Sequence, residues 1–85
     1  MLKFDYTIKD PQGIHARPAG DLIKIVKGFG CSITIEKAGK SADAGKIFAV
    51  MGLGAKSGET VTFTFDGEDE AEAMEAVKSF MEANL

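Results

Sequence analysis

The chain has 85 residues, of which 45% are hydrophobic and 27% are charged, so we expect one domain over residues 1–85 with a small core. Its formal net charge of −3 argues against nucleic acid as a partner. No apolar run is long enough to span a bilayer and the N-terminus lacks a signal-peptide pattern, so we expect a cytoplasmic protein. One histidine and one cysteine exclude an internal disulfide and a transition-metal cluster, and we expect no cofactor.

Residues 2–9 alternate between apolar and polar side chains, which is typical of a strand with one buried face. A turn over residues 10–13 leads to the only histidine and the only arginine, His15 and Arg17. Pro18 follows, and proline is tolerated in the first turn of a helix but not in its interior. Apolar residues at 19, 22, 23 and 26 then predict a helix that begins within a residue or two of His15 and ends near Lys27, before Gly28.

A helix start with a histidine and an arginine favours phosphate chemistry. The unpaired N–H groups and the positive end of the helix dipole attract an anion. An imidazole is partly neutral and nucleophilic near pH 7. Arg17 adds a permanent charge and a planar fork that suits phosphate oxygens. These features predict that His15 accepts a phosphoryl group, which Arg17 and the backbone of Ala16 and Arg17 stabilise. A helix-capping or surface histidine is the alternative.

The remaining segments predict three more strands and two more helices. Residues 31–36 and 60–66 alternate as strands, and a hairpin turn at 37–40 leads to a short strand at 40–42. Cys31 falls on an apolar strand position, so we expect a buried structural thiol. Residues 46–52 form a segment too short for a stable isolated helix, which packing must hold, and glycines 52, 54 and 58 predict a flexible loop after it. A last helix covers 68–84, with an apolar stripe at Met74, Val77, Met81 and Leu85 and with Ala73 and Phe80 beside it.

The order β-α-β-β-α-β-α predicts a two-layer α+β domain, with a mainly antiparallel sheet covered on one side.

Charge is unevenly distributed along the chain. Residues 66–85 carry a net charge of −6, whereas residues 1–65 carry +3. The part that contains His15 is therefore mildly basic and would suit an acidic protein surface.

The segment 46–52 has more apolar side chains than a short helix can bury. Ile47, Phe48, Val50 and Met51 cannot all face inward on a helix of about one and a half turns. They either close one end of the core or leave apolar surface exposed for a partner. Met and Phe suit a surface that accepts several partners.

The run Gly13-Ile14-His15-Ala16-Arg17-Pro18-Ala19 resembles the active-site signature of HPr, the histidine-containing phosphocarrier family of the bacterial sugar phosphotransferase system. The run at 45–54, GKIFAVMGLG, resembles the second HPr signature and departs from it at Lys46. The resemblance covers essentially the whole chain. It implies an open-faced sandwich of a four-stranded antiparallel sheet, in the strand order 1-4-2-3, and three helices.

The resemblance also implies a function. The protein would accept a phosphoryl group from Enzyme I on Nδ1 of His15 and donate it to sugar-specific IIA domains, as a carrier and not as an independent catalyst. Docking would use Ile47, Phe48 and Met51, with Lys24 and Lys27 as a basic rim. We expect Lys46 to add attraction to an acidic partner, and we expect a monomer.

Two alternatives remain for the function. One is a nitrogen-type HPr paralogue in a regulatory phosphorelay, with the same chemistry and other partners. The other is an HPr-like docking module or corepressor, a class that lacks the histidine and is therefore disfavoured by His15. In many Gram-positive members of the family, the position of Lys46 is a serine that a regulatory kinase phosphorylates. Lysine has no hydroxyl group, which predicts that this chain does not respond to that kinase.

Overall fold

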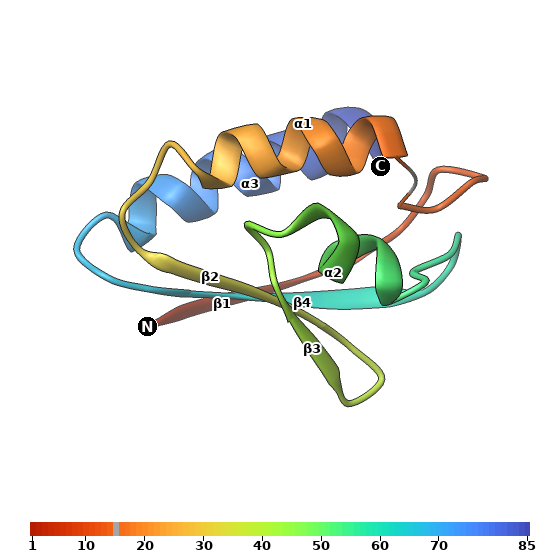
Figure 1. The fold of residues 1–85 in the computed structure, drawn as a ribbon, viewed down its shortest axis with the longest axis horizontal. Coiled ribbons are helices and arrows are strands. Elements are labelled where there is room, and N and C mark those ends of the chain that lie inside the picture. The colour runs from red at the N-terminus through yellow and green to blue at the C-terminus, as the bar shows by residue number, and fades with distance from the viewer. Residues whose placement is uncertain (15) are drawn as a thin grey trace.

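The computed structural model describes residues 1–14 and 16–85 and arranges them as two layers (Figure 1). The elements confirm the predicted order. They are β1 (Leu2–Thr7), α1 (Ala16–Val26), β2 (Ser32–Lys37), β3 (Lys40–Asp43), α2 (Ile47–Gly52), β4 (Thr60–Asp66) and α3 (Glu70–Asn84).

The four strands form one antiparallel sheet in the order β1-β4-β2-β3, as the resemblance implied. The central strand β4 pairs with β1 through Phe4 and Phe63 and with β2 through Ile35 and Phe63. Phe63 thus lies at the middle of the sheet, stacked on Phe4 with ring centroids 5.2 Å apart. Because alternate residues of each strand face opposite sides, this register places the apolar residues on the side of the helices.

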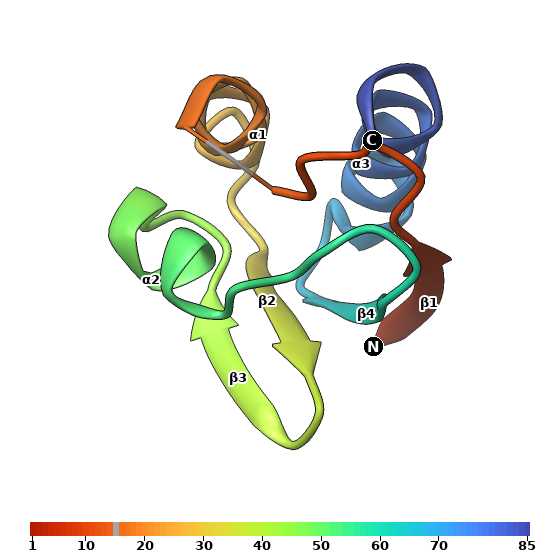
Figure 2. The ribbon, with the colours of Figure 1, turned by 90° about the vertical axis from the view of Figure 1, so that its right-hand side faces the viewer.

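The helices cover one face of the sheet and leave the other open (Figure 1). α1 and α3 lie side by side above the sheet, and α2 lies below α1 near the end of β3 (Figure 2). The open face is polar. On it, the hydroxyl of Thr62 donates a hydrogen bond to Asp5 over 2.6 Å, and the hydroxyls of Thr7 and Thr60 are 3.0 Å apart. The predicted open-faced sandwich is confirmed.

The core lies between the sheet and the helices. All four predicted apolar positions of α1 are buried, at 19, 22, 23 and 26. Along α3, the predicted stripe is buried at Val77, Met81 and Leu85, and Met74 packs against the core from its edge. Ala73 is fully buried together with Val77 and Met81, whereas Met74 is only half-buried. Ala73, which we expected beside the stripe, is thus part of the buried face, which advances by four residues at each step.

Three other details differ from the prediction. β1 ends at Thr7 and not at residue 9, although the N–H of Ile8 still donates to the carbonyl oxygen of Glu59 over 2.9 Å. α3 begins at Glu70 and not at 68, with Asp69 as its N-cap residue. Cys31 is half-buried just before β2, so the expectation of a buried thiol is wrong. Burial nevertheless raises the pKa of this thiol, and so does the carboxylate of Asp69.

No helix in the part of the chain that the structure describes has both the length and the apolar character needed to cross a bilayer.

Candidate functional site

The start of α1 lies where the sequence predicted it. The helix begins at Ala16, directly after His15 in the chain, and Pro18 is buried in its first turn. Ala16 and Arg17 are exposed. The first N–H groups of a helix have no partner within it, so this end of α1 offers donors and a partial positive charge to an anion. His15 itself lies outside the described residues, and its role as the phosphoryl acceptor stays a prediction.

The segment that leads into α1 packs tightly against the loop after α2. The N–H of Ile14 donates to the carbonyl oxygen of Ala55 over 3.0 Å. Gly13 has φ of +68°, and a Cβ added to it would overlap the carbonyl oxygen of Ala55 and lie 2.8 Å from Cα of Lys56. Glycine fits here because it tolerates positive φ and a close approach of backbone. The path of the chain into the helix is thus set by the 53–59 loop.

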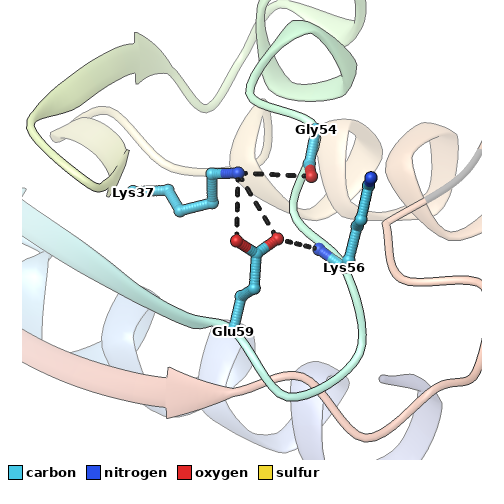
Figure 3. Close-up of polar contacts among 4 residues, drawn as sticks. All are labelled: Lys37, Gly54, Lys56 and Glu59. Atoms are coloured by element: carbon cyan, nitrogen blue, oxygen red, sulfur yellow. Dashed lines mark hydrogen bonds and ion pairs between the residues drawn. The ribbon is translucent and has the colours of Figure 1, made fainter.

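The 53–59 loop is held by a set of polar contacts (Figure 3). Nζ of Lys37 donates to the carbonyl oxygen of Gly54 over 3.3 Å and lies 3.4 Å from both carboxylate oxygens of Glu59. The backbone N–H of Lys56 donates to Oε1 of Glu59 over 2.7 Å. That N–H, followed by the ammonium of Lys37, lowers the pKa of Glu59.

The glycines of this loop suggested flexibility, but the structure fixes both ends of it. The N–H of Gly58 donates to the carbonyl oxygen of Ile8 over 2.8 Å, next to the bond from Ile8 to Glu59. Sequence reasoning missed the Lys37–Glu59 pair, because its members lie 22 residues apart in sequence. Opposite charges at the ends of neighbouring strands were the available signal, since Lys37 ends β2 and Glu59 precedes β4.

α2 divides its apolar side chains between the core and solvent. Val50 is fully buried, Ile47 and Met51 are half-buried, and Phe48 is 84% exposed. Lys46 is the N-cap residue with extended backbone angles, φ −122° and ψ 111°, and its side chain is exposed. The sequence argument that some apolar surface must remain outside the core is therefore confirmed.

α2 runs antiparallel to α1. A Cβ on Gly20 would lie 3.8 Å from Cδ1 of Ile47, and one on Gly45 would lie 3.8 Å from Cγ1 of Val26. The segment that enters α2 is therefore near the end of α1, α2 begins beside Gly20, and the loop after α2 returns to Ile14, just before α1.

Basic side chains line the face of α1 that borders α2. Residues three and four apart share a helix face, so Arg17, Lys24 and Lys27 flank Gly20 on that side. All three are exposed. The structure thus brings together the two groups that the sequence separated: the basic residues of α1, and the apolar side chains of Ile47, Phe48 and Met51. We call this combined surface, with Ala16 and Lys46, the α1–α2 face.

Two other features bear on what the site can hold. Within residues 1–14 and 16–85, no group of three or more His, Cys, Asp and Glu side chains is placed to bind a metal ion. A hollow at the other end of α1 is lined by Gly30, Glu68 and Asp69. Two carboxylates would repel a phosphate, so this hollow does not suit the ligand that the start of α1 favours.

The architecture is that of an open-faced β-sandwich with a basic and apolar face at one side of the helical layer. The family model described as "PTS HPr component phosphorylation site" matches residues 2–83. The phosphocarrier protein HPr of Lysinibacillus sphaericus is 40% identical over 81 residues, which are 95% of this chain and 92% of that protein. The chain belongs to the HPr family, the phosphocarrier proteins of the phosphotransferase system.

Other relatives carry the same fold under different descriptions. The HPr-like protein Crh of Halalkalibacterium halodurans is 39% identical over 82 residues, which are 96% of this chain and 98% of that protein. The crystal structure of HPr-C-His from Thermoanaerobacter tengcongensis has a TM-score of 0.93 at 34% identity and covers 98% of this chain and 93% of that one. A dimer of HPr from the same organism has a TM-score of 0.78 at 34% identity, with 98% and 95% covered.

Proposed function

We propose that residues 1–85 form one phosphocarrier domain, which accepts a phosphoryl group from Enzyme I on His15 and passes it to sugar-specific IIA domains. The observation that carries the proposal is the position of His15 in the chain, immediately before the first turn of α1 and two residues before the exposed Arg17. This placement offers a nucleophile, helix N–H donors and a guanidinium to one phosphate.

The chemistry requires little from the protein itself. A neutral imidazole nitrogen attacks phosphorus, and the bond from phosphorus to the donor breaks as the P–N bond forms. The N–H groups of Ala16 and Arg17 and the guanidinium of Arg17 would stabilise the charge on the phosphoryl oxygens. The same groups would contact the phosphoryl oxygens when the protein accepts the group from Enzyme I and when it donates the group to a IIA domain. A carrier of this kind is a substrate of its partners and not an independent catalyst.

The α1–α2 face is the proposed docking surface. Phe48 is its exposed aromatic anchor, and the partly buried Ile47 and Met51 lie on either side of it in the sequence. Lys24, Lys27 and Lys46 form a basic rim that suits an acidic partner surface and speeds encounter. We propose the cytoplasm as the site of action, because the proposed donor and acceptors transfer phosphoryl groups there.

Incubation with phosphoenolpyruvate and Enzyme I tests the proposal. The protein should gain the mass of one phosphoryl group, labile in acid, and His15→Ala should gain none while melting at the temperature of the parent. Mapping of the phosphate by fragmentation under mild conditions completes the assay. Absence of transfer to the parent, or acid-labile phosphate on the His15→Ala variant, would contradict the proposal.

A regulatory role is the second candidate, supported by the 39% identity to the HPr-like protein Crh. A docking module would bind its target without any phosphoryl acceptance on His15. A nitrogen-type carrier would accept the group and pass it to other partners. Transfer from phospho-protein to a panel of IIA domains separates these possibilities. We propose a monomer, which sedimentation equilibrium checks against the dimer described for the Thermoanaerobacter tengcongensis relative.

A further inference from the structure

We propose that Lys56 is a second phosphate-binding cation of the His15 site, and that Glu59 and Lys37 position it. The inference rests on the proposed function, since it concerns the phosphoryl group carried on His15. It assigns a role to a residue that lies about 40 positions after His15 and Arg17 in the sequence and comes near the start of α1 only through the fold.

The 53–59 loop places the backbone of Lys56 against the segment that enters the site. A Cβ on Gly13 would lie 2.8 Å from Cα of Lys56, and the neighbouring carbonyl of Ala55 accepts the N–H of Ile14 over 3.0 Å. Lys56 therefore lies against Gly13, two positions before His15 in the chain, and the preceding residue Ala55 holds Ile14. Its exposed side chain has a flexible four-carbon stem, which is long enough to bring the ammonium to a phosphoryl group at the start of α1.

The backbone of Lys56 is fixed by the carboxylate beside it. Its N–H donates to Oε1 of Glu59 over 2.7 Å, and Glu59 is in turn paired with Lys37 at 3.4 Å. In Figure 3, the side chain of Lys56 leaves the loop away from this carboxylate, so the ammonium and the backbone N–H point to different sides. A fixed backbone reduces the conformational entropy lost when the ammonium binds a phosphate.

The charges around the loop favour this role. Glu59 alone would repel a phosphate and attract the ammonium of Lys56. Lys37 occupies the carboxylate instead, because its Nζ bonds both Glu59 and the carbonyl oxygen of Gly54. Lys56 thus remains available as a positive charge on the loop side of the site. Arg17 supplies the other positive charge from the first turn of α1, so the two cations come from different elements.

The experiment uses the full chain, phosphorylated by Enzyme I and then separated from it. The parent is compared with Lys56→Gln, with Lys56→Arg, and with Lys3→Gln as a matched control, because Lys3 is exposed on the open face of the sheet. Phosphorus NMR follows the titration of the phosphoryl group in each isolated phosphoprotein. A nearby cation favours the dianion, so Lys56→Gln should raise the pKa of the phosphoryl group by about 0.3 to 0.7 units.

Lys56→Arg should keep the pKa of the phosphoryl group at the parent value, and so should Lys3→Gln. The rate of phosphoryl transfer from Enzyme I should fall about two- to fivefold in Lys56→Gln. Equal phosphoryl pKa values in the parent and Lys56→Gln would overturn the proposal, even if transfer were slower, because a docking role alone would slow transfer. A parent that Enzyme I does not phosphorylate would refute the proposed function instead, so the two failures are distinguishable.

Discussion

Gly13→Ala should be among the most damaging single substitutions outside the core, because two separate costs meet at this residue. At φ of +68° an alanine is strained by roughly 1–2 kcal/mol relative to its usual conformation. Its Cβ would also overlap the carbonyl of Ala55, so the 53–59 loop must move and the bond from Ile14 to Ala55 is lost. Overpacking costs about 1–3 kcal/mol and a lost hydrogen bond about 1 kcal/mol.

Gly54→Ala is the matched control. Gly54 has φ of +63°, nearly that of Gly13, but no described atom beyond its two neighbours in the chain lies within 4 Å of a Cβ added to it. Both substitutions carry the same backbone strain, which the lower entropy of the unfolded alanine chain partly offsets. The difference between the two variants therefore measures the overlap with the loop, and we expect it to be about 2 kcal/mol.

Urea unfolding of the two variants and the parent gives the free energies directly. In a domain of this size, about 2 kcal/mol corresponds to a Tm lower by roughly 8–16 °C. Phosphoryl transfer from Enzyme I should also slow in Gly13→Ala, measured well below its Tm, because the path into α1 changes. If Gly13→Ala were no less stable than Gly54→Ala, the close packing of Gly13 on the 53–59 loop would be refuted.

Four further predictions follow from the site and its surroundings. Arg17→Lys should slow transfer without abolishing it, because the charge stays but the bidentate fork is lost; a parent-like rate would remove Arg17 from the site. Phe48→Ala should weaken binding to Enzyme I or a IIA domain by about 2 kcal/mol or more in calorimetric titration. Because Phe48 is 84% exposed, the melting temperature of the Phe48→Ala variant should stay near that of the parent. A large loss of stability with unchanged affinity would contradict the docking role of Phe48. The serine kinase and ATP should leave no acid-stable phosphate on the parent, whereas Lys46→Ser should acquire it; acid-stable phosphate on Ser41 or Ser57 of the parent would refute this. The N–H groups of Gly30 and Cys31 depress the pKa of Asp69, so its stabilising effect is present above the unfolded pKa of about 3.9 and is lost as pH falls through the folded pKa. Asp69→Asn should therefore weaken the dependence of the free energy of unfolding on pH below about 4. If this dependence were the same in the variant and the parent, the Asp69 carboxylate would contribute nothing to stability.

The fold was largely predictable because its strands and helices have strong apolar periodicity. The alternation in β1 and β4 and the spacing in α1 each identify one buried face, and the sandwich follows from covering those faces. The relative burial of Met74 and Ala73 on α3 could not be read from the sequence, because hydrophobicity ranks Met74 above Ala73. Close packing reverses that order, since a fully buried alanine fits where the helix lies near its neighbours.

The site was predictable only where its residues are adjacent in sequence. Arg17, Pro18 and the helix start lie within a few positions of His15, and local rules identify them. The contacts of the 53–59 loop were not predictable, because strand pairing and not sequence proximity brings Lys37 to Gly54 and Glu59. The glycines of this loop suggested flexibility. In the structure, Gly54 and Gly58 adopt the positive φ of turns, and these turns lead the chain from α2 past Gly13 to β4.

The small apolar area on α2 has a consequence for timing. A single exposed ring with two half-buried neighbours supports an interface at the small end of those that proteins form. For a Kd of about 10 μM and an association rate constant of about 10⁷ M⁻¹s⁻¹, the complex would last on the order of ten milliseconds. A carrier has to leave its donor before it can serve an acceptor. In the proposed role, the modest size of the patch around Phe48 would therefore limit how long each partner occupies the protein, and so set how many transfers per second one molecule can complete.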